Sequence, residues 1–287
     1  MDKKQEQTPL LDLLKNTLYI NLANRQDRCT HIQKELAKIG INEPTRFNAI
    51  KTNMGQVGCS MSHMKCLEMA KQAGWDHVFI CEDDAVFTDP TLLLERLNKA
   101  QQIPVWDVLI VGGNNQRPFF QTSYDGFIQV HNCQTTTAYI VKKAYYDTLI
   151  QNIKESLEKL LREPQLKHLF SIDIYWKNLQ IKDTWLMAIP ATVSQLDGVS
   201  DIEGRPVSYN QMMLDHEKKW MDNSPPMNKM FIPYPVGHQP SPVQNKNPVE
   251  NQSSSKIEPL GSGWGKGFLK TLPKKQGIGM DRIINKK

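Results

Sequence analysis

Hydrophobic residues in this chain form short apolar runs with amphipathic stretches between them. The apolar runs have the length of buried strands and cover residues 17–22, 77–81 and 107–111, and the more polar segment 45–50 is predicted as a further strand. Between them, apolar positions recur every three to four residues, which predicts helices over 27–39 and 59–72 and from residue 90 onward. We expect Asp27 to be the N-cap of the first helix. Strands that alternate with helices indicate β-α-β units, so the pattern predicts an α/β protein with a mostly parallel sheet flanked by helices.

The pattern is less regular in the middle of the chain and changes in character near the C-terminus. Further strands are predicted over 127–130, 138–141 and 184–189, and a long helix over 142–162. Residues 223–287 hold nine of the seventeen prolines, and such a composition cannot bury enough apolar area to offset the entropy of ordering. We therefore expect an N-terminal extension (1–16), a single folded domain (17–220) and a disordered Pro/Lys/Gly-rich tail (221–287).

The basic excess of the chain lies in this tail. The formal net charge is +5, but after Trp220 ten basic residues stand against four acids, a net charge of +6, which leaves −1 on the first 220 residues. A basic tail attracts polyanions or an anionic membrane surface weakly and in a salt-sensitive way. Specific nucleic-acid binding is therefore disfavoured.

Other features bear on the cellular compartment. No apolar run is long enough to span a bilayer, and the acid-containing first residues do not resemble a secretory signal. The five cysteines include no C-x-x-C pair, so neither a zinc site nor a disulfide framework is indicated. We expect a cytoplasmic protein with no transmembrane segment, whose cysteines are buried small hydrophobes.

Three consecutive carboxylates, Glu82, Asp83 and Asp84, follow one of the apolar runs. Ligands of open α/β sheets bind at the carboxyl ends of strands, and adjacent carboxylates are costly to hold together unless a cation neutralises them. Glu82 and Asp84 could share one ion, and oxygen ligands favour Mg²⁺ or Mn²⁺, which usually bridge to a diphosphate. The alternative is an exposed acidic turn before the helix that begins near Pro90.

A second polar group follows the first predicted strand. It comprises Asn21, Leu22, Arg25 and Arg28. Arginine side chains beside a helix N-terminus suit the phosphates or the ring of a nucleotide. The alternative is that Arg25 and Arg28 are solvated or pair with Asp27.

Five segments, taken in order, resemble glycosyltransferase family 25, which includes lipopolysaccharide sugar transferases and procollagen galactosyltransferases. They are YINL (19–22) with Asp27 and Arg28, GCSMSH (58–63), VFICEDDAVF (78–87), SIDIY (171–175) and SQLDGVSDI (194–202). The resemblance covers roughly residues 17–205 and leaves out the tail. Ala23 and Asn24 depart from the family pattern, which often has a further basic residue there.

The resemblance implies a GT-A-like fold, a nucleotide-sugar donor that is usually a UDP-sugar, and a divalent cation, Mn²⁺ or Mg²⁺. It also implies inverting transfer to an acceptor hydroxyl, on a glycan or a protein. In this scheme Glu82 and Asp84 bind the metal ion, with Asp201 or Asp197 as a further ligand. The donor-binding residues are Asn21, Leu22, Arg25, Arg28, Asp83 and His63, with Asp83 at the ribose or holding the end of the strand. The alternative for His63 is to hold the start of its helix against the sheet.

A single displacement also needs a carboxylate that accepts the proton of the attacking hydroxyl. Asp173 matches the late aspartate of the family and is the predicted catalytic base. The alternative is that Asp173 serves as an ordinary N-cap for a helix over 174–179.

Two other functions compete with sugar transfer as explanations of these residues. A sugar nucleotidyltransferase would carry a Gly-rich, basic loop after its first strand, and residues 23–26 contain no glycine. The second rival is a catalytically silent relative that acts as a binding or structural protein through its tail. The presence of Glu82, Asp83, Asp84 and Asp173 speaks against this second rival.

Overall fold

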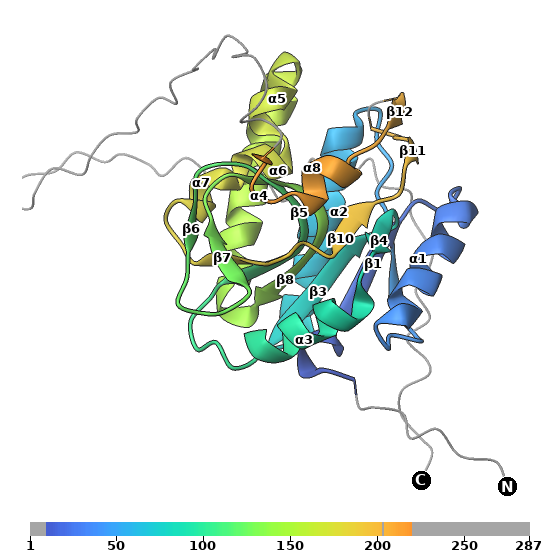
Figure 1. The fold of residues 1–287 in the computed structure, drawn as a ribbon. Coiled ribbons are helices and arrows are strands. Elements are labelled where there is room, and N and C mark those ends of the chain that lie inside the picture. Colours follow the sequence, from blue (N-terminus) through green and yellow to red (C-terminus); the bar gives the residue numbers. More distant parts are fainter. Residues whose placement is uncertain (1–9, 203, 220–287) are drawn as a thin grey trace, which may run out of the picture. The chain divides into compact units, whose positions relative to one another are not determined.

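An eight-stranded sheet forms the centre of the fold, and its strand order is β2-β1-β3-β8-β5-β9-β7-β6 (Figure 1). The computed structural model describes residues 10–202 and 204–219, which belong to one unit spanning residues 1–228. The strands of the large sheet are β1 (Thr17–Asn21), β2 (Thr45–Asn48), β3 (His77–Glu82), β5 (Val108–Asn115), β6 (Phe119–Gln121), β7 (Phe127–Val130), β8 (Cys133–Lys142) and β9 (Trp185–Ala188). Two small sheets pair β4 (Ala85–Phe87) with β10 (Val193–Gln195), and β11 (Gly198–Val199) with β12 (Pro206–Val207).

Most strands of the large sheet run in one direction. β2, β1 and β3 are parallel neighbours, and β5 is parallel to β9. β8 lies antiparallel between β3 and β5, and β7 is antiparallel to both β9 and β6. β8 and β7 therefore run opposite to the six other strands of this sheet. The predicted β-α-β units are present, with one reversed strand inserted at the centre.

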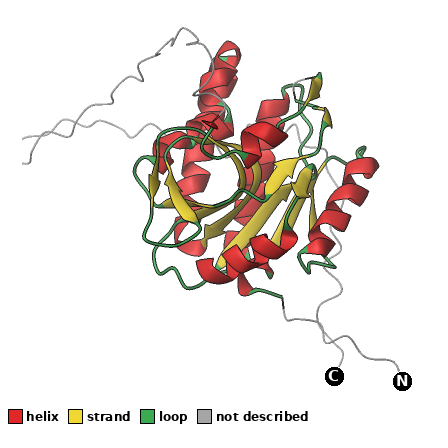
Figure 2. Cartoon of the chain, viewed as in Figure 1, coloured by secondary structure: helices red, strands yellow, loops and turns green. Residues whose placement is uncertain are grey.

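Helices cover both faces of the sheet (Figure 2). The α-helices are α1 (Gln26–Lys38), α2 (Gly55–Gln72), α3 (Pro90–Ala100), α4 (Tyr146–Arg162), α5 (Lys167–Phe170), α6 (Ile172–Tyr175), α7 (Lys177–Gln180) and α8 (Asn210–Leu214). Short 3₁₀ turns occur at η1 (Asp12–Leu14), η2 (Lys143–Tyr145) and η3 (Pro164–Leu166). The result is a layered α/β fold, as the apolar pattern predicts.

The alternation of side chains along each strand divides the core in two. In β3, Val78 and Ile80 pack with α2 and α4, whereas Phe79 and Cys81 pack with α1 and α3. β1, β5 and β8 contribute to both clusters in the same alternating way. Because successive side chains of a strand point to opposite faces, a sheet buried on both sides reads as an unbroken apolar run. The runs at 77–81 and 107–111 have this origin.

Two local predictions are wrong. Asp27 lies inside α1 and does not cap it, because the helix begins at Gln26 after Arg25, and the Asp27 carboxylate pairs with the Arg25 guanidinium instead. α2 begins at Gly55, four residues before the predicted start. In contrast, α3 begins at Pro90 as predicted, with Asp89 as an N-cap that accepts a hydrogen bond from the Leu92 amide.

The predicted tail (221–287) and most of the predicted N-terminal extension (1–9) lie outside the described residues. Within 10–202 and 204–219, no helix combines the length and the apolar character that a membrane crossing requires.

Candidate active site

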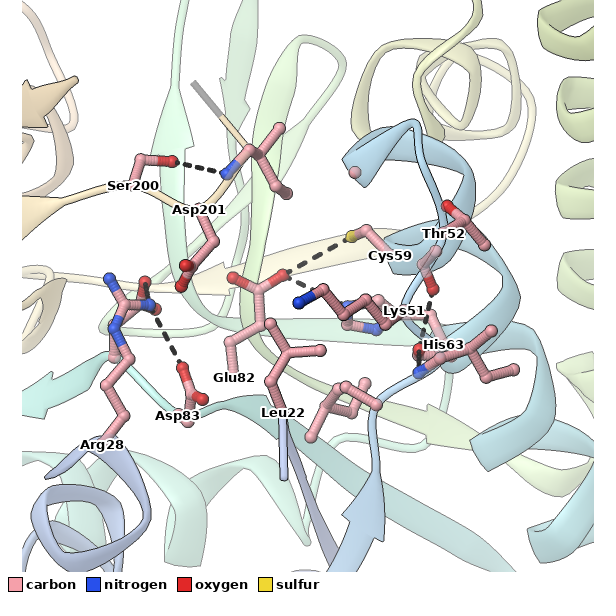
Figure 3. Close-up of a pocket in the computed structure, with 18 of the residues that line it drawn as sticks. Leu22, Arg28, Lys51, Thr52, Cys59, His63, Glu82, Asp83, Ser200 and Asp201 are labelled. Carbon is pink, nitrogen blue, oxygen red and sulfur yellow. Dashed lines mark hydrogen bonds and ion pairs between the residues drawn. The ribbon is translucent and has the colours of Figure 1, made fainter. Parts of the chain in front are cut away.

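A cavity of about 420 Å³ lies at the carboxyl ends of β1 and β3. Because β1 and β3 are parallel neighbours, with Ile20 opposite Glu82, their carboxyl ends meet at the same edge of the sheet. The cavity is completed by residues 49–53 after β2, by the start of α2 and by residues 195–202 (Figure 3). It therefore lies where ligands bind in open α/β sheets.

Glu82, at the end of β3, is held through one carboxylate oxygen. The Thr136 hydroxyl donates to Glu82 Oε1 over 2.5 Å, and His63 Nε2 lies 3.2 Å from the same oxygen. His63 is fully buried, and its Nδ1 lies 2.8 Å from the Tyr139 hydroxyl. Burial works to raise the pKa of Glu82, but the His63 and Thr136 hydrogen bonds outweigh it and lower the pKa. Glu82 is thus an ionised, oriented carboxylate at the cavity.

Asp83 and Asp84 share one cation, the guanidinium of Arg28. Arg28 Nη1 lies 2.8 Å from Asp84 Oδ2 and 3.2 Å from Asp83 Oδ1. Burial and the nearby Glu82 raise the pKa of Asp84 to about 7, although Arg28 opposes the shift. Burial also raises the pKa of Asp83. One guanidinium therefore faces two carboxyl groups of raised pKa beside Glu82, and a divalent cation bound here would favour their ionised forms.

Asn21 and Arg25 do not line the cavity, but they contact residues that do. The Asn21 amide donates to Asp83 Oδ2 over 2.7 Å and to the Arg25 carbonyl over 3.0 Å. Arg25 makes an ion pair with Asp201 and a second one with Asp27. Asn21 thus positions Asp83. Arg25, through its ion pair with Asp201, connects the loop that follows β10 to the start of α1.

The loop that follows β10 forms one side of the cavity. Gln195, Ser200, Asp201 and Ile202 line it, and Figure 3 shows Asp201 and Glu82 directed into the same space. Arg28 Nη2 donates to the Val199 carbonyl over 3.1 Å, which adds a second attachment to α1. Tertiary structure therefore places Asp201 at the same cavity as the strand-end carboxylates.

The opposite side of the cavity is formed by a segment that the sequence analysis did not single out. Leu22 lines the cavity as predicted, together with Lys51 and Thr52. The Ile50 amide donates to the Ser62 hydroxyl of α2 over 2.8 Å. A Cβ on Gly58 would lie 2.3 Å from the Ile50 carbonyl oxygen, so only glycine permits this approach. The one signal in the sequence is that residues 49–53 lie at the end of a strand predicted to be parallel to the first, where ligands of such sheets bind.

Asp173 does not line this cavity and is not an N-cap. It lies within α6, which Ser171 precedes, and its Oδ2 accepts a hydrogen bond of 3.1 Å from the Thr135 amide. Thr135 has a φ of +69°, a left-handed conformation uncommon for a β-branched residue. Burial raises the pKa of Asp173, although the Thr135 hydrogen bond and Lys177 oppose the shift. Thr136, the next residue in the chain, holds Glu82, so Asp173 is linked to the cavity through β8.

Two sets of side chains could hold a metal ion. The predicted set, Glu82, Asp84 and Asp201, lines one cavity and offers the oxygen ligands that Mn²⁺ and Mg²⁺ prefer. In the second set, ligand atoms of Cys59, His63 and Glu82 lie within 4.8 Å of one another. Sequence reasoning missed Cys59 as a candidate ligand, because Cys59 and Glu82 are brought together only by the packing of α2 on β3.

Residues 52–162 match the family model of glycosyltransferase family 25 (LPS biosynthesis protein). The matched segment contains His63, the three strand-end carboxylates and Thr136, and the resemblance noted in the sequence is confirmed over it. The segments around Arg28, Asp173 and Asp201 lie outside the match.

Solved structures are similar to this chain only at low identity. A protein from STIV is 13% identical with a TM-score of 0.36, covering 70% of this chain and 96% of that one. A Drosophila beta-1,4-galactosyltransferase 7 mutant, in complex with manganese, UDP-Gal and xylobiose, is 10% identical with a TM-score of 0.37, covering 74% and 80%. A glycosyltransferase involved in glycosylation of the major capsid of PBCV-1 is 9% identical with a TM-score of 0.33, covering 61% and 91%. At these TM-scores the similarity says nothing about substrate or reaction. No curated protein matches the sequence significantly.

Proposed function

We propose that this protein is a metal-dependent glycosyltransferase that moves a sugar from a nucleotide-sugar donor to an acceptor hydroxyl with inversion. The donor we propose is a UDP-sugar, and the acceptor a hydroxyl of a glycan or a protein. The observation that carries the proposal is that one cavity gathers Glu82, Asp83 and Asp84 with Arg28 and Asp201. Part of this group lies in the segment that matches glycosyltransferase family 25.

The residues of the cavity can serve a donor in distinct ways. Glu82, Asp84 and Asp201 would hold a Mn²⁺ or Mg²⁺ ion, which when bound neutralises the charge that develops on the leaving diphosphate. Arg28 can turn from the carboxylates to a phosphate, since its planar guanidinium suits both partners. Leu22 and residues 49–53 would contact the nucleoside, and Asp83, positioned by Asn21, would accept hydrogen bonds from the ribose.

Asp173 is the proposed base that accepts the proton of the acceptor hydroxyl. Its support is a partly buried carboxyl of raised pKa, with one oxygen fixed by the Thr135 amide. A general base works best when its pKa approaches the working pH. Since Asp173 lies outside the described cavity, the acceptor would approach from the β8 side, with its hydroxyl between Asp173 and the donor.

The experiment that tests the proposal is a screen of nucleotide sugars with Mn²⁺, scored by slow hydrolysis of the donor without an acceptor. Melting temperature is measured in parallel with UDP, with Mn²⁺ and with both. A true donor site predicts a rise in Tm with UDP that requires Mn²⁺, because a ligand that binds the native state stabilises it. Hydrolysis of one donor together with this rise supports the proposal, and the absence of both contradicts it.

The alternative is a catalytically silent relative that acts as a binding or structural protein through its tail. One observation favours it: Asp84 is already paired with Arg28, and Asp201 with Arg25. In that case the ion pairs would persist, and removal of metal ions with EDTA would not change the Tm measured in the presence of UDP. The predicted tail, its contact with membranes or polyanions, and the cytoplasmic location are separate proposals that this screen does not address.

A further inference from the structure

Cys59 has no assigned role in the proposed reaction, and His63 is predicted only as a donor contact, yet both line the cavity beside Glu82. They are four residues apart on α2, so their side chains lie on the same face of the helix. Cys59 Sγ lies 3.9 Å from Glu82 Oε1, and His63 Nε2 lies 3.2 Å from that same oxygen. A thiol, an imidazole and a carboxylate therefore converge on one point.

The separations of these atoms suit a tetrahedral zinc site. Zinc bonds of about 2.0 to 2.3 Å place the ligand atoms of a tetrahedron roughly 3.3 to 3.8 Å apart. The observed separations of 3.2 and 3.9 Å fall close to this range, and the ligand atoms of all three residues lie within 4.8 Å of one another. Only small side-chain adjustments would be needed to bind an ion.

Second-layer hydrogen bonds orient two of the three ligands. The Tyr139 hydroxyl lies 2.8 Å from His63 Nδ1, which directs Nε2 toward Glu82, and Thr136 donates to Glu82 over 2.5 Å. Metal-bound histidines almost always use their second ring nitrogen in this way. The cavity provides a path of entry and room for a water or substrate oxygen as fourth ligand.

We propose that Cys59, His63 and Glu82 form a binding site for a thiophilic divalent cation of the Zn²⁺ class, distinct from the all-oxygen set of Glu82, Asp84 and Asp201. Thiolate and imidazole ligands select Zn²⁺, whereas carboxylate sets suit Mn²⁺ and Mg²⁺. On binding, Cys59 gives up its thiol proton to solvent and coordinates as a thiolate. Because both sets use Glu82, Zn²⁺ and Mn²⁺ are expected to compete.

Cobalt titration of the full chain tests the site without any donor. Co²⁺ substitutes for Zn²⁺, and a Cys59 thiolate bound to it produces a sulfur-to-cobalt absorption band in the near ultraviolet. We expect this band in the unmodified protein, its loss on addition of Zn²⁺, and its absence in Cys59→Ser. Cys29→Ser, which changes a partly exposed cysteine on α1, is the matched control and should keep the band.

A second variant tests the site independently if Cys59→Ser fails to fold. Tyr139→Phe removes only the hydroxyl beside His63, and loss of such a second-layer partner is expected to weaken Zn²⁺ binding by about 10-fold or more. Isothermal titration with Zn²⁺ measures this change. No band, a band lost in Cys29→Ser but kept in Cys59→Ser, or unchanged affinity in Tyr139→Phe would overturn the proposal. These readouts need no sugar transfer, so failure of this site and failure of the proposed function are separable.

Discussion

Arg28 Nη1 and Asp84 Oδ2 form an ion pair of 2.8 Å at the edge of the cavity, and the same nitrogen reaches Asp83. All three side chains are largely buried, with exposed fractions of 10%, 15% and 11% for Arg28, Asp84 and Asp83. One arginine therefore balances part of the charge of three consecutive carboxylates. When all three carboxylates are ionised, they carry more negative charge than one guanidinium can balance.

Replacing Arg28 by Met is expected to destabilise the fold in a pH-dependent way. Removal of one partner of a buried ion pair costs about 3–5 kcal/mol, because the remaining charges are uncompensated. Asp83 and Asp84 can escape this cost by binding protons, so the loss should be large at pH 8 and smaller at pH 5.5. Urea unfolding at both pH values measures the difference in the free energy of unfolding between the variant and the unmodified protein. Arg28→Lys, which keeps the charge, should recover part of the stability, and an equal loss at both pH values would point to packing instead.

Asp84→Asn is expected to stabilise the protein while weakening donor binding. The pKa of Asp84 is raised to about 7 in the folded state, against 3.8 for the free carboxyl. The folded state therefore holds a proton that the unfolded state releases above pH 4, and stability falls as pH rises from 4 to 7. An asparagine at position 84 does not ionise, so the variant is spared this loss of stability as the pH rises.

Melting curves test this expectation. The Asp84→Asn variant should gain roughly 2–6 °C in Tm at pH 8 and almost nothing near pH 4, and it should lose the Mn²⁺-dependent response to UDP. Asp76→Asn, which changes an exposed carboxylate, is the control and should show neither effect. A lower Tm at pH 8 would show that the pairing with Arg28 outweighs burial.

Asp173→Asn is expected to lower the rate of sugar transfer by roughly 10²–10⁴-fold, the usual contribution of a general base. Mn²⁺ and UDP should still raise the Tm of this variant, because Asp173 does not line the donor cavity. Transfer kinetics and melting curves together provide the measurement. If donor binding is lost as well, Asp173 acts by holding Thr135 and, through the adjoining Thr136, Glu82.

Gly58→Ala is expected to move the segment after β2 away from α2. The new Cβ would lie 2.3 Å from the Ile50 carbonyl oxygen, and overpacking of this kind costs about 1–3 kcal/mol. Affinity for UDP should fall with stability, which titration calorimetry and urea unfolding measure. Gly74→Ala, where nothing lies within 4 Å, should cost about 1 kcal/mol through its φ of +72° and leave UDP affinity unchanged. Unaltered UDP affinity in Gly58→Ala would place the nucleoside elsewhere.

The local elements of the fold could be predicted because each depends on short-range pattern. The buried strands appear as apolar runs, and α3 begins at Pro90 after an Asp89 cap, a signal contained in a few residues. The position of β8 could not be predicted, because an antiparallel strand between β3 and β5 is decided by pairings with strands far away in the chain. Asp27 was misassigned for a local reason: α1 begins one residue earlier, at Gln26, and the Asp27 carboxylate pairs with Arg25, two positions before it.

The candidate site was predicted in part. The strand-end carboxylates and Arg28 were identified from sequence, and the structure places them in one cavity. Lys51 was missed, because nothing in its immediate sequence marks it. Asp173 stays a predicted base: it lies outside the described cavity, where its carboxylate accepts a hydrogen bond from the Thr135 amide.

The sequence by itself determined which residues carry charge at the ends of apolar strands and that these strands would form a layered α/β sheet, because hydrophobic periodicity acts over a few residues. Tertiary structure alone decided that Arg28 pairs with both Asp83 and Asp84, that Asp201 returns to the cavity, and that Cys59 and His63 meet Glu82. These contacts join segments from 19 to more than 170 positions apart in the chain. Such distances between residues are set by strand order and helix packing, which no local pattern encodes.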